Sequence, residues 1–289
     1  MGNELPYRLV AFDLDNTVLD RGAMSKETKR ALKELKRKGT INVAATGRHI
    51  SLIPDSIRRN HSIDYIICVT GASVYERKTR KMTYLWQMTA EEAHRAIASC
   101  KSANARLNLV TRERAFAERA AFTAFIKTPA VKGQTHEKSS IGQILRLFRL
   151  VLVSSLMDDA AGYLDDHPTA LVEKIDAFFD RDEETAQAVR LREESGSFEI
   201  AQSPRYLEIT AKNCTKGNGI RWLCESLDLA KRDVIAFGDS GNDLSMLEHT
   251  GLFVAMGNAE PAVLERARRI APGVKEDGFA AVVRDVFSI

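Results

Sequence analysis

Two parts of the chain, at its beginning and its end, alternate short apolar runs with segments of helical spacing. The apolar runs are residues 8–12, 41–45 and 65–69 at the start, and 234–237, 252–255 and 269–271 at the end. Nearly continuous apolar strands that alternate with helices are typical of a parallel sheet covered on both faces. The pattern predicts an α/β core, a Rossmann-like parallel sheet with helices on both sides.

The helical segments between these runs carry recognisable ends. The first, residues 25–38, places Ala31, Leu32 and Leu35 on one face, with Ser25 as a candidate N-cap and Gly39 as the stop. The others are predicted at residues 219–226, 243–249 and 261–267.

The middle of the chain, from about residue 82 to 208, has a different pattern with denser charge. Its helical stretches are predicted at residues 89–103 and 170–179, and its strands at 106–111, 148–154, 198–201 and 206–209. Residues 128–140 have the least pattern and are predicted to form a loop. We therefore expect an α+β cap domain at residues 84–206, inserted into a core made of residues 1–83 and 207–289.

Acidic side chains follow two of the predicted strands of the core. Asp13 and Asp15 come directly after the first strand, and Asp239 and Asp243 come after the strand at 234–237. Ligands of open parallel sheets bind beyond the carboxyl ends of the strands. Carboxylates there can share a hard cation, and one of them can attack phosphorus. The same residues are also common in turns, and Asp243 is placed to cap a helix.

Two further segments suit a phosphate group. Thr46, Gly47 and Arg48 follow the strand at 41–45 and offer a hydroxyl, backbone N–H groups and a guanidinium. Lys216 precedes the helix that begins near residue 219. Taken alone, the first segment equally fits a strand-to-helix turn, and a single lysine fits a solvated surface.

The order of these motifs is specific: DxDxT, then Thr-Gly-Arg, then Lys, then GDxxND. In this order the sequence resembles the haloacid dehalogenase superfamily of hydrolases, and most closely its Cof-like branch, which carries a large α/β cap between the second and third motifs. The resemblance covers residues 7–80 and 206–280, including the sequence segments 207–210 and 253–259.

The resemblance implies a role for each matching residue. Asp13 would be the nucleophile that forms an aspartyl-phosphate, and Asp15 would act first as general acid and then as general base. Residues implied to bind phosphate are Thr46, Gly47, Arg48, Lys216 and Asn242. Residues implied to hold Mg²⁺ are Asp13, Asp15 through its carbonyl, Asp239 and Asp243.

Two positions depart from the family pattern. Thr70-Gly71 stands where many Cof-like proteins have Asn-Gly, so a substrate contact from that Asn is not carried over. The first motif has Asn16 where Gly is commoner, and Asn tolerates the left-handed backbone that the loop would need.

Composition narrows the class of protein. A net charge of +3 over 289 residues argues against a dedicated nucleic-acid binder. No apolar run approaches the roughly 20 residues of a membrane span. The four cysteines form no CxxC pair, which is typical of reduced thiols, so a cytoplasmic protein is expected. The sequence carries no signal for an oligomeric state.

We therefore expect a Mg²⁺-dependent phosphatase that acts on small phosphorylated metabolites. Sugar phosphates are the first substrates to expect among them. A phosphomutase on the same scaffold is an alternative, and dependence on a sugar-bisphosphate activator would distinguish it. A non-catalytic phosphate-ligand sensor is a second alternative, and turnover of a phosphate ester would exclude it.

The segment Gly-Asp-Ser-Gly at 238–241 also suggests a serine-protease interpretation, but Asn242 follows where Gly is needed.

Overall fold

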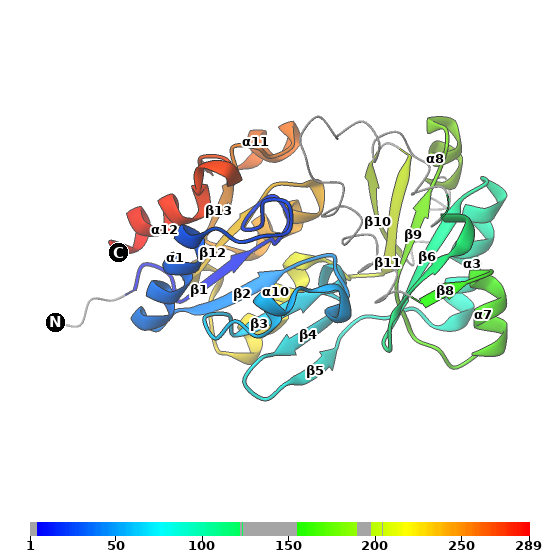
Figure 1. Ribbon diagram of the computed structural model, residues 1–289, viewed down its shortest axis with the longest axis horizontal. Coiled ribbons are helices and arrows are strands. Elements are labelled where there is room, and N and C mark those ends of the chain that lie inside the picture. Colours follow the sequence, from blue (N-terminus) through cyan, green and yellow to red (C-terminus); the bar gives the residue numbers. More distant parts are fainter. Residues whose placement is uncertain (1–4, 122, 124–154, 190–197, 204) are drawn as a thin grey trace. The chain divides into compact units, whose positions relative to one another are not determined.

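The computed structural model describes residues 5–121, 123, 155–189, 198–203 and 205–289, which divide into two compact units (Figure 1). Unit 1 comprises Met1–Leu85 and Cys214–Ile289, and unit 2 comprises Trp86–Asn213. The boundary expected between residues 206 and 207 falls inside strand β11 (Tyr206–Ala211). That strand pairs on both sides with strands of unit 2, so the structure places the boundary after it.

Unit 1 is built on a sheet of order β14-β13-β12-β1-β2-β3-β4-β5. Its strands are β1 (Leu9–Phe12), β2 (Ile41–Ala45), β3 (Tyr65–Cys68), β4 (Ser73–Glu76), β5 (Lys81–Tyr84), β12 (Val234–Gly238), β13 (Leu252–Ala255) and β14 (Arg269–Ile270). Six neighbouring strands run parallel, and β4 and β5 add an antiparallel edge. The predicted α/β fold class is confirmed.

Helices connect these strands. They are α1 (Lys26–Lys38), α2 (Asp55–Arg58), α10 (Lys216–Ser226), α11 (Pro261–Arg266) and α12 (Gly278–Phe287). Short 3-10 segments are η1 (Ile50–Leu52), η2 (Val69–Gly71), η3 (Lys231–Asp233), η4 (Gly241–His249) and η5 (Val274–Glu276). Helix α1 begins after Ser25, whose hydroxyl accepts from the Thr28 amide, and ends at Gly39 in the left-handed conformation, as its sequence predicted.

The sheet of unit 1 buries both faces because side chains alternate along each strand. Leu9 and Ala11 of β1 belong to the hydrophobic cluster that includes Ile220 of α10. On the opposite face Phe12 meets Phe279 of α12 edge-on, with 5.3 Å between the ring centroids. This two-sided burial fixes β1 at the centre of unit 1, and with it the residue that follows.

Unit 2 has a six-stranded sheet of order β10-β11-β9-β6-β7-β8. Its remaining strands are β6 (Arg106–Thr111), β7 (Ala115–Glu118), β8 (Ser155–Met157), β9 (Val172–Phe178) and β10 (Phe198–Ser203), and its described helices include α3 (Ala90–Ser102), α7 (Ala160–Asp166) and α8 (Asp182–Val189). The helix predicted at residues 170–179 is wrong: β9 pairs with β6 on one side and β11 on the other. The strand at 148–154 and the loop at 128–140 lie outside the described residues.

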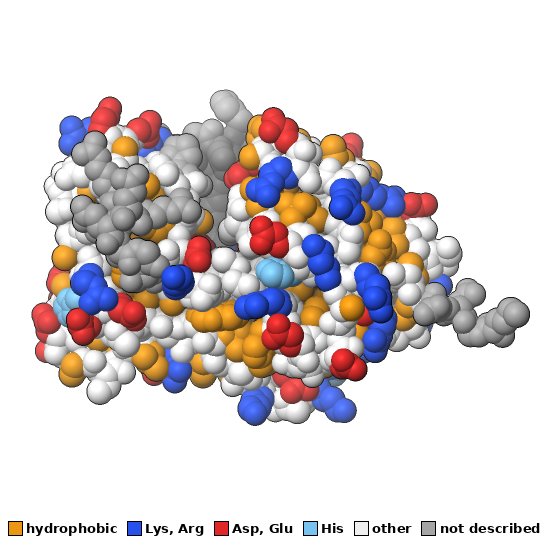
Figure 2. Space-filling view, turned by 180° about the vertical axis from the view of Figure 1, so that it is seen from behind, with side chains coloured by type: hydrophobic (Ala, Val, Ile, Leu, Met, Phe, Trp, Pro, Cys, Tyr) orange, Lys and Arg blue, Asp and Glu red, His pale blue; other side chains and the backbone are white. Residues whose placement is uncertain are grey.

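Charged side chains of both signs share the surface (Figure 2), and the four cysteines lie in the interior. On the face shown in Figure 2, Lys and Arg side chains are mixed with Asp and Glu over the described residues. Cys68, Cys100, Cys214 and Cys224 are all buried and free. Within the described ranges, the structure contains no helix with the length and apolar character of a membrane span.

Candidate active site

The carboxyl ends of three neighbouring strands bring together residues far apart in the sequence. Asp13 follows β1, Asp239 follows β12, and Thr46 follows β2. Strands β1 and β12 pair in register Phe12↔Phe237, and the Asp13 amide donates to the Phe237 carbonyl at 3.0 Å. The predicted meeting of these motifs at one sheet edge therefore follows from parallel pairing alone.

Lys216 joins this edge from the start of α10. The helix is capped by Thr215, whose hydroxyl accepts from the Asn218 amide at 3.1 Å. The Lys216 ammonium donates to Asp13 Oδ1 and to Asp243 Oδ1, each at 2.7 Å. Only 1% of this lysine is exposed, which excludes the solvated-surface interpretation of the sequence.

Two glycines permit these close approaches. A Cβ on Gly217 would lie 2.0 Å from the Ser245 carbonyl oxygen, so α10 packs on η4 only with glycine at this position. A Cβ on Gly238 would lie 2.5 Å from Cβ of Asp243. The sequence predicted no role for either glycine, although Gly238 is the first residue of the GDxxND motif and Gly217 follows Lys216.

Asp243 caps η4, as its sequence position suggested, and also pairs with Lys216. Its Oδ2 accepts from the backbone amides of Asp239 at 2.9 Å and Ser240 at 3.0 Å, which caps η4. Its Oδ1 accepts from Lys216. The carboxylate is completely buried, so its orientation is fixed by these three donors.

Three carboxylates converge at this point. Asp13, Asp239 and Asp243 each place one oxygen so that all three oxygens lie within 4.8 Å of one another. Thr17 donates its hydroxyl to Asp239 Oδ1 at 3.1 Å and so orients that side chain. Thr17 is the last residue of the DxDxT motif, which is the signal that could have assigned it this role.

The charges of the cluster are unbalanced. Burial is the largest cause that raises the pKa of Asp13, with the neighbouring Asp243 carboxylate adding to it and Lys216 opposing it. Burial and then Asp243 raise the pKa of Asp239 to about 6. Burial alone would lower the pKa of Lys216, but Asp13 and Asp243 outweigh it and raise the pKa. One ammonium among three carboxylates leaves an excess of negative charge. A divalent cation bound by the carboxylate oxygens would neutralise it.

Asp15 lies outside this trio of carboxylates. Its side chain is paired in a fork with Arg48, whose Nε and Nη2 donate to the two carboxylate oxygens at 2.7 and 2.6 Å. Arg48 also donates from Nη1 to the Leu52 carbonyl at 3.3 Å. The guanidinium predicted to bind phosphate thus orients Asp15 here, and a contact of Arg48 with phosphate stays a prediction.

The remaining predicted residues line the same edge without joining the cluster. Thr46 is buried, and its Oγ1 accepts from the Arg48 amide at 3.3 Å, across Gly47. Asn242 accepts from the Ser240 hydroxyl at 2.9 Å. Asn16 has φ of 56°, which confirms the left-handed backbone expected for it.

Comparisons with known proteins show which family the chain resembles. A family model described as haloacid dehalogenase-like hydrolase matches residues 10–283. The 5-amino-6-(5-phospho-D-ribitylamino)uracil phosphatase YcsE of Bacillus subtilis is 24% identical, over 97% of this chain and 96% of its own.

Solved structures share the fold. A haloacid dehalogenase-like hydrolase from B. subtilis has a TM-score of 0.82 at 21% identity and covers 96% of this chain and 99% of its own. The HAD subclass IIB sugar phosphatase BT4131 has a TM-score of 0.77 at 22% identity and covers 98% of this chain and 100% of its own. The predicted enzyme class, a phosphatase, is confirmed, and the chain belongs to the haloacid dehalogenase-like hydrolases.

Proposed function

We propose that this phosphatase is Mg²⁺-dependent and hydrolyses small phosphorylated metabolites through a phosphate ester of Asp13. The observation that carries the proposal is the buried cluster in which Lys216 holds Asp13 and Asp243 at 2.7 Å beside Asp239. Phosphoryl transfer depends mainly on positioning and on stabilisation of charge, and this cluster supplies both.

The donor set fits a hard divalent cation. Asp13, Asp239 and Asp243 offer only oxygen atoms, and together they carry more negative charge than Lys216 balances. In our proposal these carboxylates and the carbonyl of Asp15 hold the ion. When bound, Mg²⁺ would offset the repulsion between the attacking carboxylate and the phosphate.

The first chemical step forms a bond between the free Asp13 oxygen and phosphorus. Lys216 occupies only Oδ1, so Oδ2 is the proposed nucleophile. The bond from phosphorus to the ester oxygen breaks, and the leaving oxygen takes a proton from Asp15. Both oxygens of Asp15 accept from Arg48 in the structure, so this transfer requires the fork to open at one oxygen, where Asp15 then carries the proton. The products are an alcohol and the aspartyl-phosphate.

The second step releases inorganic phosphate. Asp15, now deprotonated, takes a proton from a water molecule while the water oxygen attacks phosphorus. The bond between phosphorus and the Asp13 oxygen then breaks. Thr46, with its hydroxyl at the end of β2, and the adjoining Gly47 are the proposed phosphate contacts, with Asn242 beside them. Asp13 is regenerated as a carboxylate, and the cycle balances without any other reactant.

The proposed substrates are phosphomonoesters of sugars or polyols. Two similar proteins, a sugar phosphatase and a phosphatase of a ribityl phosphate, act on compounds of this kind. We further propose that unit 2 is the specificity element, as in the Cof-like branch. The chain passes between the units at residues 85/86 and 213/214, and the second passage lies two residues before Lys216.

A panel of phosphorylated metabolites, assayed for released phosphate with metal-stripped protein, tests this function. We expect hydrolysis only after Mg²⁺ is returned, with sugar phosphates among the best substrates. Full turnover in excess chelator would exclude the metal dependence. Release of no phosphate from any member, with a generic aryl phosphate also inert, would exclude the phosphatase mechanism at this site.

A further inference from the structure

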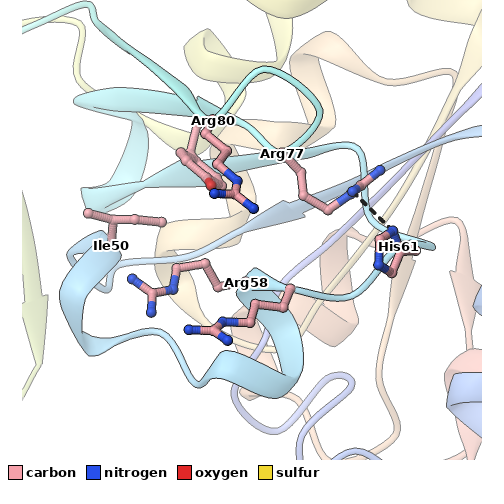
Figure 3. Close-up of a pocket in the computed structure, with 7 residues that line it drawn as sticks. Ile50, Arg58, His61, Arg77 and Arg80 are labelled. Carbon is pink, nitrogen blue, oxygen red and sulfur yellow. Dashed lines mark hydrogen bonds between the residues drawn. The ribbon is translucent and has the colours of Figure 1, made fainter.

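Unit 1 also has a pocket lined by basic side chains from the α2 segment and from the turn between β4 and β5. The cavity has a volume of about 530 Å³ and is lined by the arginines Arg58, Arg59, Arg77 and Arg80. Ile50, His61 and Tyr75 complete the lining. Figure 3 shows these side chains around the hollow between the α2 segment and the β4–β5 turn. None of them belongs to the Asp13 cluster.

The guanidinium groups of this basic pocket outnumber the carboxylates that pair with them. Arg58 and Arg59 share Asp55, at 2.5 and 3.5 Å. In the part of the chain that the structure describes, Arg77 and Arg80 take part in no ion pair. Four cations and one paired anion leave an excess of three positive charges around one hollow.

One of these arginines is held in place by neutral acceptors. Arg77 donates from Nε to the Ile63 carbonyl at 2.7 Å and from Nη1 to His61 Nδ1 at 3.3 Å (Figure 3). Because neither acceptor carries a negative charge, the guanidinium keeps its full charge for a ligand. An arginine held by neutral acceptors binds an anion more strongly than an arginine that is already paired with a carboxylate.

We propose that this basic pocket binds a ligand carrying a diphosphate group. Its volume lies within the range of small-molecule sites, roughly 300–1,000 Å³. A monophosphate carries at most about two negative charges, whereas a terminal diphosphate carries about three, which matches the excess. Arginine forks bind phosphate oxygens in pairs, and Tyr75 with Ile50 offers a surface for an organic part of the ligand.

Calorimetric titration of the whole protein with pyrophosphate and with ADP, in metal-free buffer, tests the proposal. The test variant is Arg59→Gln with Arg80→Asn, because both side chains are exposed and Asn accepts the left-handed φ of 58° at residue 80. The matched control is Arg266→Gln with Arg268→Gln, two exposed arginines near β14, at the opposite edge of the sheet from β4 and β5.

We expect wild-type protein to bind pyrophosphate at one site, the test variant to bind it at least tenfold more weakly, and the control to match wild type. Tighter binding of ADP would identify a nucleotide that also uses Tyr75, and equal binding would identify the diphosphate alone. Absence of saturable binding to wild type, equal binding by the test variant, or an equal loss in the control would overturn the proposal. If the double variant has a lower melting temperature than wild type, Arg59→Gln alone is the test variant. Its affinity for pyrophosphate is then expected to fall at least threefold.

Discussion

Replacement of Lys216 by methionine is the sharpest single perturbation of the active-site cluster. Methionine has nearly the length of the lysine stem but carries no charge and cannot donate. Wild-type Lys216 is 1% exposed and makes two hydrogen bonds of 2.7 Å, to Asp13 and Asp243. The substitution therefore leaves three buried carboxylates with no cation beside them.

The expected cost follows from that burial. Removing one partner of a buried ion pair costs about 3–5 kcal/mol, because the remaining charge stays desolvated. At about 2–4 °C per kcal/mol, the melting temperature should fall by roughly 10 °C. Loss of Lys216 also removes the group that opposes the raised pKa of Asp13. The pKa of Asp13 is about 8 with Lys216 present and should rise further without it, so the destabilisation should shrink as pH falls from 9.5 to 7.5, where Asp13 is mostly protonated in both folded proteins.

Urea unfolding in metal-free buffer, followed by circular dichroism at both pH values, measures this cost. Lys29→Met, at an exposed position of α1, is the matched control and should change the free energy of unfolding by less than about 0.5 kcal/mol. A loss below about 1 kcal/mol for Lys216→Met at pH 9.5, or the same loss at both pH values, would refute the electrostatic reasoning.

Three further predictions concern neighbouring residues. In metal-free buffer, the raised pKa of Asp239, about 6 against 3.8, means that the folded state binds this proton more tightly; its contribution to stability is lost as pH rises from about 4 to 6. Asp239→Asn should remove up to about 3 kcal/mol of that pH dependence in urea titrations; an unchanged slope would contradict the shift. Asp15→Asn should trap phosphorylated protein with an aryl phosphate, since an activated leaving group needs little acid while release needs the base; rapid-quench labelling with no accumulation would count against Asp15. Gly217→Ala should cost about 2 kcal/mol or more, because its Cβ would meet the Ser245 carbonyl at 2.0 Å, whereas Gly162→Ala should cost far less in the same melts, its nearest contact being an ordinary 3.6 Å.

Local patterns predicted the core of the fold well and unit 2 less well. The strands of the core are short apolar runs with turn residues behind them, and their length and flanking residues favour buried parallel strands over helices. Residues 170–179 are different: Leu171, Ile175 and Phe178 have helical spacing. They form a strand because β6 and β11 supply hydrogen-bonding partners on both sides, which are distant in the sequence and carry no local signal.

Some contacts of the site could be predicted from local sequence and others could not. Asp13, Asp239 and Thr46 each follow a parallel strand, so they lie at the same edge of the sheet. The fork between Arg48 and Asp15 does not, because it depends on how the loop after β2 turns. The close packing at Gly217 is likewise a property of two segments meeting, which a single sequence does not express.

The central claim, that Asp13 becomes phosphorylated during turnover, is tested most directly by chemical trapping. Wild-type protein would be mixed with Mg²⁺ and an excess of aryl phosphate, quenched in acid within milliseconds, and treated with borohydride, which reduces an acyl phosphate to the alcohol. Peptide mass spectrometry should then find homoserine in place of Asp13, dependent on substrate and absent from Asp13→Asn. Sustained turnover without modification at residue 13, or wild-type turnover by a folded Asp13→Asn variant, would contradict the account.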